Sequence, residues 1–279
     1  MLWLLYMPRE CLSIVVPAYN EEKTLPIVVE KLLEVPNLLE VVIVDDCSTD
    51  GTSHVAASLE AANPKVRLLR HSRNSGKTAA LKTGFKATRG DIVLVQDADL
   101  EYDPAEIPSL LNPILNGQAD VVYGSRFLVR QGSRVLYFYH YLANRFLTFV
   151  SNLLTNVNMT DVETGYKAFR GTIIRNMTIN SSGFGFEIEV TAKIAKLGCV
   201  IYEVPISYHG RTYAEGKKIG LMDGLQALWL ILRFNLFCRL ESSFHNLPQL
   251  QSPNQEAGQI DVTLRSQPVA RSMGAGQRT

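Results

Sequence analysis

The sequence has few cysteines, no long uninterrupted apolar run and almost no net charge, and each of these absences excludes a class of protein. Its four cysteines lie far apart without any C-x-x-C spacing, which argues against a cysteine metal site and favours free thiols in a reducing compartment. The formal net charge of +1 gives no overall attraction to nucleic acid, so no nucleic-acid partner is expected.

No segment predicts a helix that spans a membrane, because such a helix needs about 20 consecutive apolar residues. The apolar run at residues 1–7 is short and is followed by Pro8, so residues 1–10 are expected to be an N-terminal extension without a signal peptide. The stretches 135–154 and 225–240 are apolar but interrupted by polar and charged residues. Both are therefore predicted to be amphipathic helices.

The first half of the chain alternates between patterns typical of strands and of helices. Short apolar runs predict strands at 12–16, 39–44, 66–69, 92–95 and 120–123. The segments between them predict helices at about 23–34, 51–62, 76–88 and 104–115. Asp50 is expected to cap the second of these helices and Gly90 to end the third. This order predicts an α/β fold, Rossmann-like, with a mostly parallel central sheet and helices on both faces.

The second half is less regular. A helix is predicted over 135–155, a Glu-rich helix from about Phe186 and a strand over 199–208. From residue 241 the chain is rich in Ser, Gln, Pro and Gly without periodicity, which predicts a disordered tail over 241–279. The expected organisation is thus a catalytic domain over 11–220, followed by an amphipathic helix over 221–240 that contacts a membrane, and then the tail.

Acidic residues follow three of the predicted strands, where a parallel sheet binds its ligands. Asp46 follows the second strand, and Asp97, Asp99 and Glu101 follow the fourth. These carboxylates offer hard oxygen ligands to Mg²⁺ or Mn²⁺, and such an ion bridges the phosphates of a nucleoside diphosphate. A solvated acidic turn is the alternative for 97–101 alone. Glu21 follows the first strand in the same way. Acidic groups at neighbouring strand ends would repel one another unless a cation or the hydrogen-bond donors of a ligand lay between them.

Four segments together resemble the motif series of glycosyltransferase family 2, in order and spacing over residues 12 to about 215. They are 17–21 (PAYNE), 44–52 (VDDCSTDGT), 74–77 (NSGK) and 97–99 (DAD). The resemblance implies a GT-A fold, a nucleotide-sugar donor, a divalent metal and inversion at the anomeric carbon. Within the family the chain is most similar to the polyprenyl-phosphate glycosyltransferases, the dolichyl-phosphate mannose or glucose synthases. The segments that suggest this are 161–169, 185–189, 208–211 and 216–218.

The resemblance also implies roles for individual residues. The donor nucleotide would be bound by Pro17, Tyr19, Glu21, Asp46, Lys77 and Asp97. The metal would be held by Asp97, Asp99 and Glu101, and many family members carry Gln or Glu at the last of these positions. The acceptor phosphate would be bound by Arg126, Arg145, Asp161, Glu163, Arg211 and Lys217. The catalytic set would be Asp97, Asp99, Arg126 and Arg211.

The implied partners are a UDP- or GDP-sugar, a polyprenyl phosphate, and a membrane surface or a membrane-spanning partner. A homo-oligomer is left open. The protein is expected in the cytoplasm, peripherally associated with the membrane face. The six aromatic residues of 135–155 would lie in a bilayer interface or, alternatively, pack in the core; they are Tyr137, Phe138, Tyr139, Tyr141, Phe146 and Phe149. Ordinary ion pairs are the alternative for Arg126 and Arg145, and a solvated basic loop is the alternative for 211–218.

Other functions fit the sequence less well. A P-loop nucleotidase needs glycine at position 71, where this chain has His71, and no strand is followed by G-x-G-x-x-G. A non-catalytic nucleotide-sugar binder would have no use for the intact Asp97 and Asp99. A transferase acting on a polysaccharide or another glycan stays open, and it would need a carboxylate base such as Glu163 or Asp161.

Overall fold

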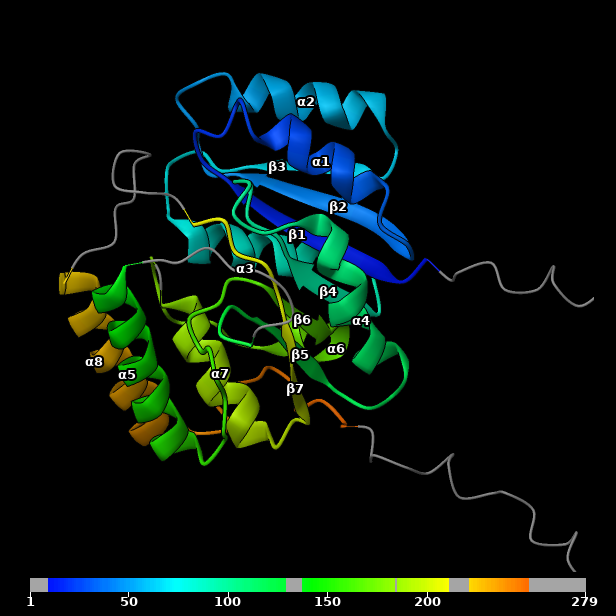
Figure 1. Cartoon of the computed structure of the whole chain (residues 1–279). Coiled ribbons are helices and arrows are strands. Elements are labelled where there is room, and N and C mark those ends of the chain that lie inside the picture. The colour runs from blue at the N-terminus through cyan, green and yellow to red at the C-terminus, as the bar shows by residue number, and fades with distance from the viewer. Residues whose placement is uncertain (1–9, 129–136, 184, 211–220, 251–279) are drawn as a thin grey trace, which may run out of the picture.

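Short aliphatic segments form one seven-stranded sheet at the centre of the molecule. The computed structural model describes residues 10–128, 137–183, 185–210 and 221–250 (Figure 1). The strands are β1 (Leu12–Ala18), β2 (Leu38–Asp45), β3 (Val66–Arg70), β4 (Ile92–Val95), β5 (Val121–Ser125), β6 (Lys167–Arg170) and β7 (Ile201–Pro205). They lie in the order β3-β2-β1-β4-β6-β5-β7. The predicted mostly parallel α/β architecture is confirmed.

One strand runs against all the others. β6 pairs antiparallel with both β4 and β5, whereas the remaining neighbours pair parallel. The carboxyl ends of the other six strands therefore meet at one edge of the sheet, and the segment that leads into β6 arrives at that same edge. The sequence did not predict β6, because four residues with a charge at each end carry no strand-like alternation.

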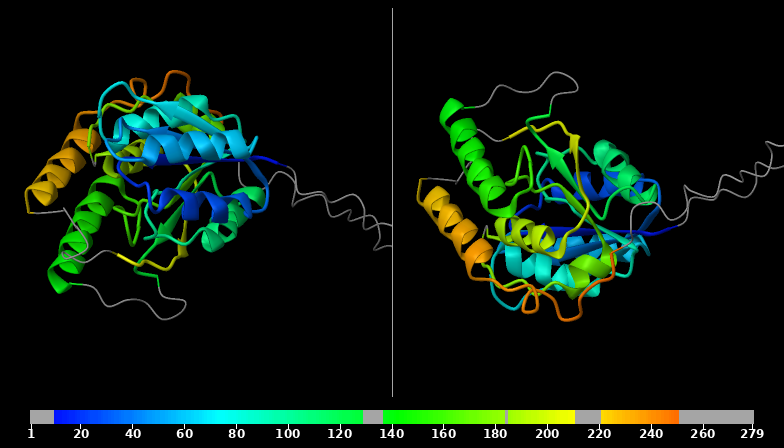
Figure 2. Two further views of the ribbon diagram at one scale, coloured as in Figure 1. Left: turned by 90° about the horizontal axis from the view of Figure 1, so that it is seen from above. Right: turned by 90° about the horizontal axis from the view of Figure 1, so that it is seen from below.

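Helices cover both faces of the sheet. They are α1 (Leu25–Leu33), α2 (Thr52–Ala62), α3 (Lys77–Ala87), the 3₁₀ turn η1 (Pro104–Glu106), α4 (Ile107–Leu115), α5 (Phe138–Thr155), α6 (Gly171–Asn176), α7 (Phe186–Leu197) and α8 (Leu221–Leu236). α1, α2 and α4 contribute to the core on one face, and α3, α6 and α7 to the core on the other. The two further views of Figure 2 show these two layers with the sheet between them.

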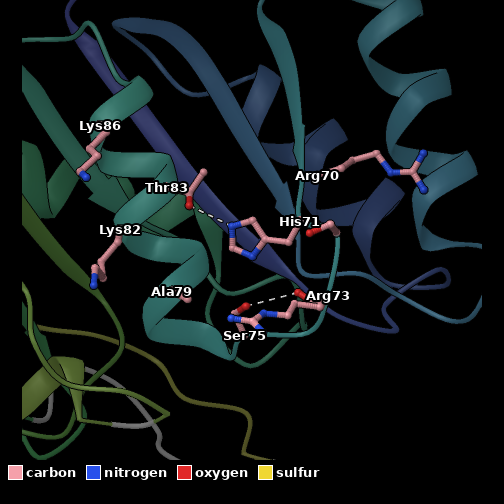
Figure 3. A pocket seen from close by; sticks show the side chains of 9 residues that line it. Arg70, His71, Arg73, Ser75, Ala79, Lys82, Thr83 and Lys86 are labelled. Atoms are coloured by element: carbon pink, nitrogen blue, oxygen red, sulfur yellow. Dashed lines mark hydrogen bonds between the residues drawn. The ribbon is translucent and has the colours of Figure 1, made fainter.

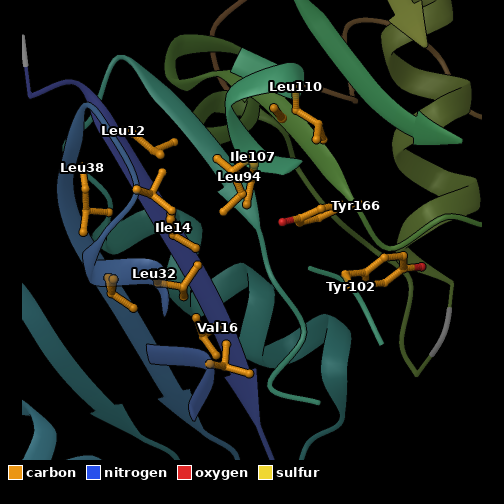
Figure 4. Packing of buried hydrophobic residues seen from close by; sticks show 14 of the residues in the cluster. Leu12, Ile14, Val16, Leu32, Leu38, Leu94, Tyr102, Ile107, Leu110 and Tyr166 are labelled. Atoms are coloured by element: carbon orange, nitrogen blue, oxygen red, sulfur yellow. The ribbon is translucent and has the colours of Figure 1, made fainter. Parts of the chain in front are cut away.

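The alternation of side chains along β1 builds both cores. Leu12, Ile14 and Val16 point toward α1 and α4, as Figure 4 shows, while Val15 points to the opposite face. All four are completely buried. Burying an aliphatic side chain of this size contributes about 1.5–3 kcal/mol, so β1 anchors the two halves of the domain.

α5 and α8 form a third layer beside α7, at one end of the molecule (Figures 1 and 2). Their inner sides pack through a small apolar cluster that includes Leu147, Ile188 and Ile231. Among the described residues no helix is both long enough and apolar enough to cross a bilayer.

Two local predictions are corrected. Gly51, not Asp50, stands at the N-cap of α2, although the Asp50 carboxylate still accepts a hydrogen bond from the backbone N–H of Thr52 at 3.0 Å. Gly90 does not end α3 in the left-handed conformation. It is needed for close packing instead, because a Cβ there would lie 2.5 Å from the carbonyl oxygen of Cys11.

The predicted disordered tail is wrong for its first ten residues. Ser243 and Phe244 are buried, and Phe244 forms a β-bridge with Met177. The burial of one aromatic ring holds 241–250 against the domain, although the composition of this stretch gives no periodic pattern. Residues 251–279 and the predicted extension at 1–9 lie outside the described residues.

Gly84 supplies a test of the packing between α3 and the sheet. A Cβ at this position would lie 2.3 Å from Cγ1 of Val15, so Gly84→Ala is expected to destabilise the protein by about 1–3 kcal/mol through overpacking. Gly224→Ala in α8 is the matched control, since nothing lies within 4 Å of a Cβ there and alanine favours the helix by about 0.5–1 kcal/mol. Urea unfolding should move the two midpoints in opposite directions; a shift in the same direction would contradict this packing.

Candidate active site

The chain turns sharply where β1 and β2 reach the common edge of the sheet. Asn20 and Cys47, just beyond these two strands, adopt left-handed backbone conformations with φ of 59° and 61°. Non-glycine residues seldom adopt this conformation, and it concentrates at functional sites. Asn20 also accepts a hydrogen bond from the backbone N–H of Thr49 at 2.8 Å, which ties the two turns together. Pro17 is half-buried and Tyr19 is exposed on the same edge.

Asp46 holds the loop that leads into α3. Its carboxylate accepts hydrogen bonds from the backbone N–H groups of Ser75 and Gly76, at 3.0 and 2.7 Å, and pairs with Nδ1 of His71 at 2.6 Å. The side chain is buried, so these contacts replace its hydration. Asp46 therefore fixes the backbone of the loop 71–76, apart from any contact that it makes with a ligand.

A basic cleft of about 460 Å³ adjoins this loop (Figure 3). His71 stands between it and Asp46, since its second ring nitrogen lies 2.9 Å from the hydroxyl of Thr83. The charged side chains that line the cleft are those of Arg70, Arg73, Lys82 and Lys86. None of the residues that line the cleft is one of the predicted donor carboxylates at β4, and the cleft adjoins Asp46 through His71 and Ser75.

A buried chain of charges links β4 to α3 and α7. Nζ of Lys77 lies 2.8 Å from Oδ1 of Asp97 and 3.5 Å from Oε1 of Glu187. Burial alone would lower the pKa of Lys77, but the two carboxylates outweigh it and the pKa is raised. Lys77 is therefore charged at every physiological pH and holds two like charges in place. Two of the predicted donor residues, Lys77 and Asp97, are brought together.

The three predicted metal ligands do not form a ready-made cage. Asp99 accepts from the backbone N–H of Glu101 at 3.2 Å, and Oε2 of Glu101 accepts from the hydroxyl of Tyr208 at 2.9 Å. Within the described ranges no three His, Cys, Asp or Glu side chains are grouped to hold an ion. Mg²⁺ commonly uses only one or two carboxylates and completes its ligands with water and substrate phosphates.

The chemistry of the residues at Asp97 suits such an ion. Gly165 packs closely on this carboxylate, because a Cβ there would come 2.8 Å from Oδ2 of Asp97. The donor set of carboxylate oxygens from Asp97 and Asp99 matches the preference of Mg²⁺ and Mn²⁺ for oxygen.

Beyond β5, Arg126 and Asp161 form a bidentate ion pair. Nε and Nη2 of Arg126 each lie 2.7 Å from an oxygen of Asp161, which also accepts from the backbone N–H of Arg126. The guanidinium stacks over the ring of Tyr208, 5.2 Å from its centre. These are the contacts of an ion pair, one of the two readings that the sequence left open for Arg126. The pair fixes the plane of the guanidinium at the edge of the site.

The segment 161–167 crosses the site between Asp97 and Arg126. Nζ of Lys167 donates to the carbonyl oxygens of Val162 and Thr164, the two neighbours of Glu163. The backbone at Glu163 is thus fixed from both sides, and the buried Oε1 atom of Glu163 has no hydrogen-bond partner among the residues that the structure describes. Burial and the charge of Glu187 raise the pKa of Glu163 to about 7.

The remaining predicted residues are placed only in part. Arg145 on α5 is exposed and donates to the carbonyl oxygen of Thr160 at 3.4 Å, close to the Arg126–Asp161 pair. Glu21 accepts from the hydroxyl of Thr24 at 2.6 Å, at the end of β1. Arg211 and Lys217 lie outside the described residues.

Sequence reasoning missed several residues that the fold brings to this site. Glu187 was seen only as part of a helix start, although a carboxylate in a buried first turn suggests a partner. Tyr102 stacks on Tyr166 with ring centres 5.0 Å apart, and its hydroxyl accepts from the backbone N–H of Gly165. Its position directly after Glu101 was the available signal. For His71 the sequence offered no signal, because its contact with Asp46 spans 25 residues.

Comparison with known proteins agrees with this arrangement. The family model described as "Glycosyl transferase family 2" matches residues 13–177, more than half of the chain. The chain belongs to glycosyl transferase family 2. An undecaprenyl-phosphate mannosyltransferase of Micrococcus luteus is 32% identical over 81% of this chain and 95% of its own length. A polyprenol monophosphomannose synthase of Mycolicibacterium smegmatis is 30% identical over 76% and 83%.

Solved structures share the fold of this glycosyltransferase. Glucosyl-3-phosphoglycerate synthase of Mycobacterium tuberculosis, in complex with Mn²⁺, uridine-diphosphate and glucosyl-3-phosphoglycerate, superposes with a TM-score of 0.62. The two chains are 23% identical, over 81% of this chain and 80% of the other. The α/β GT-A architecture expected from the sequence is thereby confirmed.

Lys77 is the test of the buried charge chain in this transferase. Lys77→Met leaves Asp97 and Glu187 without a counter-charge, and breaking a buried pair costs about 3–5 kcal/mol. Urea unfolding measures this loss. Lys82→Met on the same helix should change stability by no more than about 0.5 kcal/mol; an equal loss in both variants would contradict the assignment.

Proposed function

We propose that this family 2 transferase moves a hexose from a nucleoside diphosphate sugar to a polyprenyl phosphate, with inversion at the anomeric carbon. The observation that carries the proposal is the two-sided charge arrangement of the sheet edge. The carboxylates Asp97 and Asp99 stand on one side, and Arg126 stands on the other with the segment 161–167 between them. The two mannosyltransferases with 30–32% identity act, by their names, on polyprenyl phosphates.

On the donor side, Asp97 and Asp99 would hold Mg²⁺ or Mn²⁺, with Glu101 as an outer member. The ion would neutralise the diphosphate as it leaves with the nucleoside. Lys77 supports this step by holding Asp97 in one orientation. Pro17, Tyr19, Glu21 and the Asp46 loop would surround the nucleoside.

On the acceptor side, a phosphate monoester needs a cationic cradle more than a base, because it is already ionised near neutral pH. Arg126 and Arg145 would supply that cradle, joined by Arg211 and Lys217. The Asp161 carboxylate keeps the Arg126 fork rigid, which favours one orientation of the attacking oxygen. The attacking phosphate oxygen would then reach the anomeric carbon opposite to the leaving diphosphate.

The outer faces of α5 and α8 would bring the protein to the lipid. Large apolar side chains there stay exposed, with Tyr139 of α5 at 82% and Trp229 of α8 at 58%. We call the following set the apolar face: Phe138, Tyr139, Leu142, Phe146, Phe149, Leu153, Met222, Leu225, Trp229, Leu236 and Phe237. So large an exposed apolar set is unusual for a protein without a partner surface. Aromatic residues with an occasional Arg suit the interface of a bilayer.

The apolar face is continuous with the acceptor side. Phe127, next to Arg126, packs edge-on against Tyr141 of α5 with ring centres 5.3 Å apart. The backbone N–H of Val162 donates to the hydroxyl of Thr148, also on α5. A lipid whose phosphate lies at Arg126 would therefore have its hydrocarbon chain beside α5.

A panel of UDP- and GDP-sugars, each with and without polyprenyl phosphate and Mn²⁺ or Mg²⁺, tests the proposal. We expect one donor to release its nucleoside diphosphate only when the lipid is present, and Asp99→Ala to abolish that release without lowering the melting temperature. Release that depends on a glycan acceptor and not on the lipid would contradict the proposed acceptor. Full Asp99→Ala activity would contradict the proposed metal ligands.

The apolar face makes a separate prediction. The double variant Phe149→Glu/Trp229→Glu removes two apolar side chains that would contact the bilayer, each contributing about 1.5–3 kcal/mol. It should therefore weaken binding to vesicles at least about tenfold. Sedimentation with vesicles of phosphatidylcholine and phosphatidylglycerol measures this, while turnover of a short, water-soluble polyprenyl phosphate should stay near wild type. Ile27→Glu on α1, where the side chain is also exposed, is the control and should bind vesicles normally. Equal binding by all three proteins would exclude the apolar face as the membrane contact.

A further inference from the structure

Glu163 is half-buried, and it differs in its contacts from Glu203, another half-buried carboxylate of this protein. Glu203, for comparison, accepts hydrogen bonds from the backbone N–H groups of Thr160 and Asp161. Glu163 accepts none that the described residues provide, and its Oε1 atom is fully buried. A buried carboxyl oxygen without a partner is costly, so a group of this kind usually has a ligand or holds a proton.

The position of Glu163 is fixed although its carboxyl is not bonded. Lys167 donates to the carbonyl oxygens on either side of it, and the hydroxyl of Tyr102 holds the backbone of Gly165, two residues on. Along the chain, Glu163 stands between Asp161, which pairs with Arg126, and Gly165, which packs against the carboxylate of Asp97. The backbone around Glu163 therefore joins the acceptor side of the site to the donor side.

We propose that the protonated carboxyl of Glu163 donates a hydrogen bond to an anionic oxygen of the acceptor and so selects a phosphate whose charge it complements. The inference rests on the proposed function and adds one specificity residue to it. The neutral carboxyl supplies a hydrogen-bond donor of its own. Two N–H groups of Arg126 are already bonded to Asp161 and do not supply that donor. No proton needs to leave the pair during transfer, because a new bond forms between the phosphate oxygen and the anomeric carbon while the bond to the leaving diphosphate breaks.

The charges around Glu163 favour its neutral form. Burial raises its pKa first, Glu187 and Asp161 raise it further, and Lys167 and Arg126 oppose them, for a pKa of about 7. A phosphate dianion placed beside the carboxyl would raise the pKa again, since two adjacent anions share a proton more readily than they both ionise. The donor is therefore present below about pH 7 and is lost as the pH rises above that value.

The test measures the KM for the acceptor at several pH values between about 6.5 and 8.5. It compares the wild type with Glu163→Gln and Glu163→Ala. The amide of Glu163→Gln keeps a hydrogen-bond donor at this position at every pH, so its acceptor KM should stay within about threefold of the wild-type value near pH 6.5. Glu163→Ala should raise the acceptor KM about tenfold, as expected for the loss of one hydrogen bond to a charged group. Between about pH 6.5 and 8.5, the ratio of wild-type KM to Glu163→Gln KM should rise roughly tenfold as the wild-type carboxyl ionises.

Other outcomes overturn the proposal. If Glu163→Gln lost as much activity as Glu163→Ala, the carboxylate would be acting as a base. A pH-independent ratio of the two KM values would remove the role of the proton, and equal losses in melting temperature and turnover would make Glu163 structural. Glu60→Gln on α2 is the matched control and should leave KM and its pH profile unchanged. Lipid-dependent turnover by the wild type tests the proposed function by itself, so its failure is distinguishable from a failure of this inference.

Discussion

The ammonium group of Lys77, held between Asp97 and Glu187, is the interaction on which the site depends. It joins the end of β4, the start of α3 and the start of α7, three elements that lie 20 and 110 residues apart along the chain. The carboxylates of Asp97 and Glu187 would repel each other without it. Their contact with the same cation holds Asp97 in place at the edge of the sheet, where an oxygen-seeking metal and a diphosphate would meet it.

The antiparallel strand β6 sets the second constraint. Because it lies between β4 and β5, its leading segment 161–167 must pass over the same edge at which the parallel strands end. That segment carries Asp161 to Arg126 and Gly165 to Asp97, with Glu163 between them along the chain. One reversed strand thus brings two further carboxylates and a close-packed glycine to the edge where Asp97 and Arg126 stand.

The layer of α5 and α8 relates the site to the proposed lipid substrate. Both helices bury one side against α7 and leave the other side apolar and exposed. The same helix α5 holds the segment 160–162 through Thr148 and Arg145. A contact that orders the apolar face would therefore also act on the backbone that positions Asp161.

The sequence by itself determined six of the seven strands, the acidic strand ends and the family, because short aliphatic runs and their polar ends are local features. Sequence alone also named Asp97, Arg126, Asp161 and Glu163, but it gave Arg126 and Asp161 as separate phosphate contacts. Only the tertiary structure decided that these two form a pair, that Lys77 links Asp97 to Glu187, and that Glu101 turns to Tyr208. It also decided the place of β6 and the burial of Phe244. The physical reason is that each of these depends on contacts between residues far apart in sequence, which no local pattern encodes.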